Sequence, residues 1–78
     1  MTEDAIECYN LAIKINPNHV DTYYGKGFAL NDLGRKEEAI ECYHQTIKID
    51  PNYVDAYNRK GIVLNDLGRK EEAIDCYN

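Results

Sequence analysis

The sequence contains no serine and no CxxC pair of cysteines. A common hydroxyl nucleophile of enzymes is therefore missing, and no Cys or carboxylate forms an obvious nucleophile–base arrangement with His19 or His44. Gly25 and Gly27 belong to a helical pattern and lack the preceding strand that a phosphate-binding loop requires. We predict a protein that is not an enzyme and that uses no cofactor.

Long hydrophobic runs are also missing from the chain. No apolar run exceeds about five residues, whereas a membrane-spanning helix needs roughly 20 apolar residues. The apolar core of a signal peptide is excluded in the same way. We therefore expect a cytoplasmic protein that does not span a membrane.

Basic residues are the minority among the charged side chains. Fourteen acids stand against nine Lys and Arg residues, which gives a net charge of −5 at pH 7. Such a chain is not attracted to phosphate backbones or to anionic lipid heads. We predict no nucleic-acid partner and no binding to membranes.

What the sequence does contain is repetition. The decapeptide NDLGRKEEAI occurs at residues 31–40 and again at residues 65–74, an interval of 34 residues. Residues 20–44 match residues 54–78 at 18 of 25 positions. The same interval relates Cys8, Cys42 and Cys76, Pro17 and Pro51, and Gly34 and Gly68. A fixed period of this length indicates stacked supersecondary units, here about 2.3 of them.

Each unit reads as two helices, because apolar residues recur at steps of three and four rather than alternating. We predict an all-α chain without a sheet, with helices near residues 2–15, 20–33, 36–49, 54–67 and 70–78. Asn18 and Asn52 stand where N-caps are expected, with Asp21 and Asp55 three residues on as in a capping box. Gly34 and Gly68 are suited to a left-handed residue after a helix.

At this point the residues resemble a known family, the tetratricopeptide repeat, whose unit is a 34-residue helix-turn-helix. Its pattern of an aromatic residue, Leu-Gly, a Tyr, an Ala, a Phe and a Pro corresponds in register to residues along the whole chain. The matching residues are Ala5, Tyr9 and Pro17, then Tyr23, Gly27, Leu30, Ala39, Tyr43 and Pro51, then Tyr57, Gly61, Leu64, Ala73 and Tyr77. Lys26 and Lys60 depart from it, because the family prefers Leu there.

The resemblance implies that antiparallel helix pairs stack as a right-handed α-solenoid, whose first helices line a concave groove. We divide the chain into a second helix of a partial repeat at residues 1–19, a complete repeat at 20–53 and a repeat truncated within its second helix at 54–78. On a helical wheel, one arc of each first helix faces away from the apolar arc. The predicted partner-binding groove therefore comprises Asp21, Tyr24, Phe28, Asn31, Asp32, Asp55, Asn58, Arg59, Ile62, Asn65 and Asp66.

The residues of this groove indicate the chemistry of a protein or peptide partner. Some members of the family bind the carboxylate tails of chaperones through Lys, Arg and Asn, but here such a tail meets four aspartates and Arg59 alone. A segment that is both basic and apolar is the better electrostatic match. Two interpretations stay open for Phe28 and Ile62, contact with the partner or contact with the neighbouring repeat, and the aspartates can simply keep this face solvated.

The three cysteines lie one repeat apart on equivalent helices, about 10 Å from one another. A disulfide requires Cα atoms closer than about 7 Å. Cys42 and His44 point in nearly opposite directions on a helix and cannot share a metal. We predict no metal site and interpret each cysteine as a small hydrophobic side chain.

The chief alternative to an interaction module is a structural scaffold, either a fragment of a longer array or an engineered building block. Both ends fall within a repeat unit, because Met1 aligns with Arg35 and Asn78 aligns with His44. The helix at residues 2–15 then lacks a preceding partner, and the last helix only half covers the one before it. This interpretation predicts head-to-tail self-association.

Overall fold

The structure is a computed structural model and describes residues 2–77. Within that range the chain is all-helical, with α1 (Thr2–Ile15), α2 (Val20–Asp32), α3 (Lys36–Ile49), α4 (Val54–Asp66) and α5 (Lys70–Tyr77), and has no strand. The expected helix limits are confirmed to within one residue, except that the predicted last residue, Asn78, lies outside the described residues.

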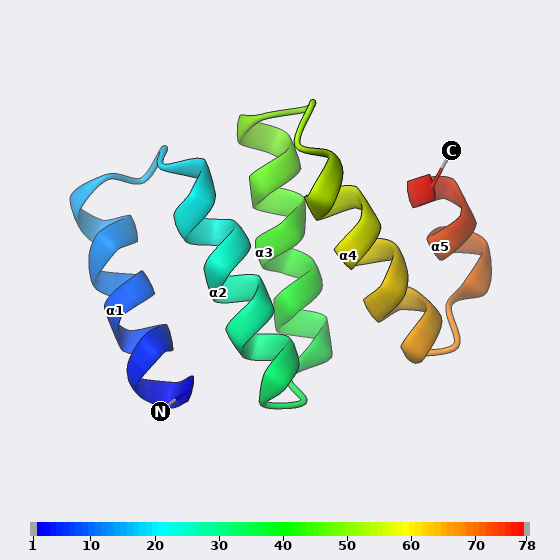
Figure 1. The fold of residues 1–78 in the computed structure, drawn as a ribbon, viewed down its shortest axis with the longest axis horizontal. Coiled ribbons are helices and arrows are strands. Elements are labelled where there is room, and N and C mark those ends of the chain that lie inside the picture. Colours follow the sequence, from blue (N-terminus) through cyan, green and yellow to red (C-terminus); the bar gives the residue numbers. More distant parts are fainter. Residues whose placement is uncertain (1, 78) are drawn as a thin grey trace.

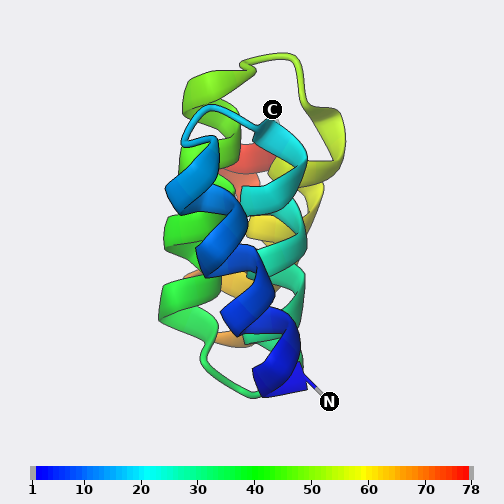
Figure 2. The same cartoon turned by 90° about the vertical axis from the view of Figure 1, so that its left-hand side faces the viewer.

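The five helices are stacked side by side in the order of the sequence (Figure 1). Each helix packs against the one before it and the one after it, and the array measures 35 × 25 × 13 Å. Seen from the α1 end, the helices form a narrow layered stack (Figure 2). This arrangement is an α-solenoid, in which each helix contacts mainly its sequence neighbours.

The turns inside the two helix pairs α2–α3 and α4–α5 are built alike. Gly34 and Gly68 have φ angles of 79° and 78°, the left-handed conformation predicted from the sequence. Around Gly34, the Gly34 N–H donates to the Asn31 carbonyl and the Arg35 N–H donates to the Leu30 carbonyl, each at 2.9 Å. This pair of bonds is a Schellman motif, which satisfies the last carbonyls of α2.

The prediction that Asn18 and Asn52 are N-caps is wrong. The capping positions belong to His19 and Tyr53, and neither side chain bonds the free N–H groups of its helix. The expected capping boxes with Asp21 and Asp55 therefore do not form.

Asn18 and Asn52 do not cap the helices, because their backbone N–H groups bond the side chain of the residue that precedes each proline. The Asn16 side-chain oxygen accepts from the Asn18 N–H at 3.3 Å, and the Asp50 carboxylate accepts from the Asn52 N–H at 3.0 Å. These local bonds close a turn over each proline. The helix then begins two residues later, so the turn chemistry and not the asparagine sets its start.

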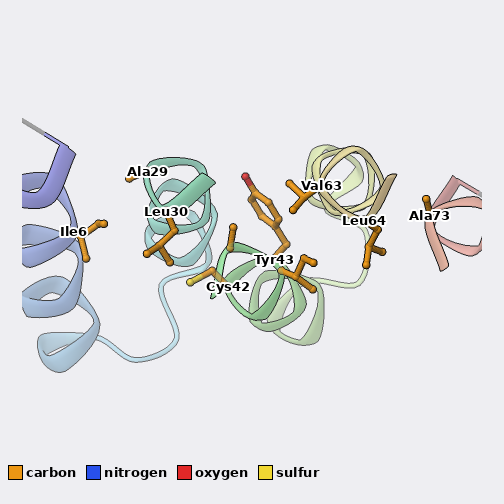
Figure 3. Packing of buried hydrophobic residues seen from close by; sticks show 10 residues of the cluster. Ile6, Ala29, Leu30, Cys42, Tyr43, Val63, Leu64 and Ala73 are labelled. Atoms are coloured by element: carbon orange, nitrogen blue, oxygen red, sulfur yellow. The ribbon is translucent and has the colours of Figure 1, made fainter. Parts of the chain in front are cut away.

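A continuous apolar core runs through the stack (Figure 3). Leu30 and Leu64, on α2 and α4, are each 1 % exposed and occupy equivalent places in the two repeats. Tyr43 of α3 is fully buried, and Figure 3 shows its ring reaching into the space between α2 and α4. One aromatic side chain thereby joins the first helices of two successive units.

Candidate functional site

The predicted groove residues come from α2 and α4, the first helices of their units. None of them is buried: Tyr24 and Asn31 are half-buried and the other nine are exposed. All are therefore accessible to a partner. The structure also forms contacts between the two helices that the sequence did not predict.

One of these contacts joins Phe28 to Arg59. The Arg59 guanidinium carbon lies 4.9 Å from the centre of the Phe28 ring, a cation–π geometry. Phe28 nevertheless keeps 41 % of its surface exposed, and Ile62 keeps 44 %. Phe28 therefore contacts the next repeat, and part of its side chain remains accessible; its contact with a partner stays a prediction.

A second contact involves Lys36 at the start of α3. Its ammonium group donates to the Asn31 side-chain oxygen at 3.1 Å and lies 3.5 Å from the Asp66 carboxylate. The charge of Asp66 is thus partly compensated. Among residues 2–77 no basic side chain forms an ion pair with Asp32, the equivalent residue of α2.

A cluster of tyrosines fixes the side chain of Tyr24. Its ring centre lies 5.8 Å from that of Tyr43 and 5.1 Å from that of Tyr53. The Tyr53 hydroxyl donates to the Asp21 carboxylate at 2.9 Å. The pKa of Tyr53 is raised to about 12, chiefly by burial and secondly by this hydrogen bond to Asp21. Sequence reasoning placed Tyr53 in a turn and missed it, because its contacts depend on how successive units are stacked.

A hollow of about 490 Å³ opens between α1 and α2. Its lining combines three aromatic side chains, three small residues and one carboxylate residue, and fewer than half of these residues are exposed. The residues are Ala5, Tyr9, Tyr24, Gly25, Phe28, Ala29 and Asp32. The sequence predicted Tyr24, Phe28 and Asp32 as groove residues. It missed Ala5 and Tyr9, because the matching residues of α3, Ala39 and Tyr43, are fully buried core.

Tyr43 carries the one unpaired buried side-chain polar atom found among the described residues, its hydroxyl oxygen. The pKa of Tyr43 is raised to about 12, chiefly by burial and secondly by the nearby Tyr24. A buried hydroxyl without a partner costs roughly 1 to 3 kcal/mol. The family pattern favours an aromatic residue here, and the chain uses Tyr at this position in all three units.

The cysteines are free, and their environments differ more than predicted. Cys42 is buried, and burial raises the pKa of its thiol. Cys8 is exposed and Cys76 is half-buried, so the three small side chains do not share one environment. Within residues 2–77 no cluster of His, Cys, Asp or Glu is grouped to hold a metal ion, and no helix has the length and apolarity to cross a membrane.

Three protein-family models match this chain, and together they cover almost all of it. A family model described as "Tetratricopeptide repeat" matches residues 20–53 and another of the same description matches residues 42–75, while one described as "TPR repeat" matches residues 2–34. A comparison with curated protein sequences finds no match.

Solved structures give the same answer at the level of the fold. MamA superposes with a TM-score of 0.96 at 32% identity, covering 97% of this chain and 44% of the MamA chain. The second TPR of Spaghetti (RPAP3), bound to the HSP90 peptide SRMEEVD, superposes with a TM-score of 0.93 at 29% identity, covering 97% of this chain and 70% of that one. This chain therefore spans less than half the length of MamA. Together the family models account for residues 2–75 with the 34-residue period and the helix pairs seen here, and the chain belongs to the tetratricopeptide repeat family.

Proposed function

We propose that the chain is a non-catalytic interaction module that binds a basic and apolar peptide segment along α2 and α4. One observation carries the proposal: Phe28 and Ile62 are large apolar side chains that stay 41 % and 44 % exposed among aspartates and asparagines. Exposed apolar side chains rimmed by polar residues are typical of peptide-binding grooves. The complete repeat at residues 20–53 supplies the first half of this surface.

The sign of the charge distinguishes this groove from one that receives an acidic tail. The Spaghetti domain is bound to a peptide with two glutamates and an aspartate. Here Asp21, Asp32, Asp55 and Asp66 face the partner, and Arg59 is occupied with the ring of Phe28. A basic segment gains from these carboxylates, whereas an acidic one is repelled. Three free cysteines suit a reducing cytoplasmic setting.

Replacing Phe28 tests the groove. Phe28→Ala is expected to weaken binding of a basic–apolar peptide by on the order of 2 kcal/mol, because it removes a large apolar anchor. Asp32→Lys is expected mainly to slow association and to reduce its dependence on salt. Fluorescence polarisation against a library of labelled basic–apolar peptides measures both effects, and circular dichroism confirms that each variant remains helical.

The matched control is Gln45→Ala, at an exposed position of α3 outside the groove. It is expected to bind like the parent. Equal binding by the parent, Phe28→Ala and Asp32→Lys contradicts the assignment and moves the interaction to another face.

A second function, end-to-end self-association, is favoured by a different observation. Ile74 of α5 is 56 % exposed, although Ile40, its equivalent in α3, is only 8 % exposed. On α1, Leu11 and Ile15 are 60 % and 85 % exposed. Both ends of the described array therefore present exposed apolar side chains, and a second copy of the chain can cover them.

Light scattering over a dilution series measures this association. We expect an apparent mass that rises with concentration, and Leu11→Lys is expected to lower it by placing a charge in the contact. Asn10→Lys adds the same charge at an exposed polar position of the same helix and is expected to have little effect. A parent chain that stays monomeric at millimolar concentration contradicts the scaffold function.

A further inference from the structure

The hollow between α1 and α2 exists because two of its residues are small. Gly25 and Ala29 line it, whereas the equivalent positions of α4 carry Arg59 and Val63. Val63 is 1 % exposed, so its side chain fills space in the second unit, whereas Arg59 extends over the Phe28 ring of α2. In the first unit the end of the Tyr9 side chain lies close to the small Gly25, and the hollow opens beside them.

Aromatic side chains dominate the walls of this hollow. Tyr9 comes from α1, and Tyr24 and Phe28 come from α2. Tyr24 is held in place by its packing against Tyr43 and Tyr53. Part of the surface is therefore fixed before any ligand arrives, which lowers the entropic cost of binding.

One ring of the hollow, that of Phe28, already binds a cationic side chain of the same protein. The guanidinium of Arg59 lies 4.9 Å from the centre of the Phe28 ring, and its interaction with the Tyr24 hydroxyl raises the pKa of Arg59. Arg59 belongs to α4, whereas the hollow is lined by residues of α1 and α2. The helices α1 and α4 lie on opposite sides of α2 (Figure 1). Phe28, one of the three aromatic side chains of the hollow, therefore already contacts a guanidinium group within the fold.

Asp32 adds a negative charge to the hollow. Its equivalent, Asp66, lies 3.5 Å from the Lys36 ammonium, but no such ion pair is formed by Asp32 among the described residues. A carboxylate beside aromatic rings favours a cation, and the planar guanidinium can stack on a ring while it bonds a carboxylate. We propose that this hollow is a subsite for an arginine side chain of the bound segment, between Tyr9, Phe28 and Asp32.

This subsite rests on the proposed function, since it lies at one end of the same groove. Two short peptides test it, acetyl-Ala-Leu-Arg-Leu-Ala-amide and the same peptide with citrulline in place of arginine. Citrulline keeps the size and planarity of the side chain but removes its charge. Two-dimensional NMR on the chain at fixed concentration gives the affinity and locates the contact. We expect the arginine peptide to bind about tenfold more tightly and to shift the signals of Tyr9 and Phe28.

Substitution of Asp32 separates charge from shape. Asp32→Asn is expected to reduce the preference for arginine over citrulline to about twofold, while leaving the affinity for the citrulline peptide nearly unchanged. Glu41→Gln removes the same charge from an exposed position of α3 outside the groove. It is expected to preserve the tenfold preference, so a general loss of negative charge is not mistaken for loss of the subsite.

The remaining outcomes overturn one or both proposals. Equal binding of the two peptides with shifts around Ile62 and Asn58 refutes the arginine subsite but leaves the groove in place. Absence of shifts on α2 and α4 with either peptide at millimolar concentration refutes both. If the Tyr9 and Phe28 signals move when the protein alone is concentrated, a second copy occupies the hollow and the subsite is refuted.

Discussion

Gly27→Ala is expected to destabilise the chain by about 2 kcal/mol, whereas Gly25→Ala, two residues earlier on the same helix, is expected to stabilise it by up to about 1 kcal/mol. Both substitutions exchange glycine for alanine inside α2, a change that by itself favours the helix by about 1 kcal/mol. The difference comes from the tyrosine that each new methyl group meets.

At Gly27 the added Cβ atom would lie 2.7 Å from Cε1 and 2.9 Å from Cδ1 of the Tyr43 ring. Tyr43 is fully buried between α2 and α4, so its ring has no space into which to move. Overpacking of this kind costs about 3 kcal/mol, which exceeds the gain in helix propensity. The glycine is required by the close approach of an aromatic ring and not by its backbone conformation.

At Gly25 the added Cβ atom would lie 2.8 Å from the Cζ and hydroxyl oxygen atoms of Tyr9. These atoms are the far end of a half-buried side chain that borders an open hollow. Tyr9 can rotate outward, so most of the gain in helix propensity remains.

Urea unfolding followed by circular dichroism measures both variants against the parent. The pair serves as its own control, because the chemical change and the helix are the same. Equal stability changes at the two positions would contradict the idea that buried Tyr43 cannot move away from a new methyl group whereas half-buried Tyr9 can.

The helix limits and turn glycines, which recur in each unit, were predictable from the sequence. The hydrogen bonds and contacts at which successive units meet were less predictable. Gly34 and the helix limits follow from local backbone preferences, which depend only on near neighbours in the chain. The caps were not predictable in the same way, because Asn16 and Asp50 compete for the N–H groups of the residues that looked like caps. Local hydrogen bonding of this kind depends on the geometry of one turn.

The candidate site shows the same difference between features that depend on one helix and features that depend on contacts between helices. The helical wheel correctly placed Phe28 and Asp32 at accessible positions, because the exposed arc of a helix follows from its period. It could not distinguish Tyr9 from Tyr43, which share a place in the repeat and differ in their neighbours. The cation–π contact of Arg59 with Phe28 likewise depends on the distance between successive first helices, a quantity that a sequence pattern does not contain.

Alkaline pH is expected to destabilise the chain strongly, in part through Tyr43. Burial raises the pKa of Tyr43 to about 12 in the folded chain, whereas an unperturbed tyrosine has a pKa of about 10. Below pH 10 both the folded and the unfolded states keep the phenol proton, so stability does not depend on this group. Between pH 10 and 12 only the unfolded state releases the proton, and the free energy of unfolding falls as pH rises.

The expected loss through Tyr43 is about 1.4 kcal/mol per pH unit, or on the order of 3 kcal/mol by pH 12. Cys42 and Tyr53, whose pKa values are also raised, add to the loss in the parent chain. Comparing the parent with Tyr43→Phe isolates the contribution of one hydroxyl, because both proteins retain the other groups.

Tyr43→Phe keeps the ring that joins α2 to α4 and removes only an oxygen that has no partner among the described residues. At pH 8 the variant is therefore expected to be at least as stable as the parent, since an unpaired buried hydroxyl is removed. Urea unfolding at intervals from pH 8 to 12 should then show the two proteins diverging above pH 10, with the variant losing less stability. Absorbance at 295 nm reports phenol ionisation in the same samples. Parallel stability curves for the two proteins up to pH 12 would show that the Tyr43 hydroxyl ionises in the folded chain as readily as in the unfolded one, and that the seal between α2 and α4 admits water.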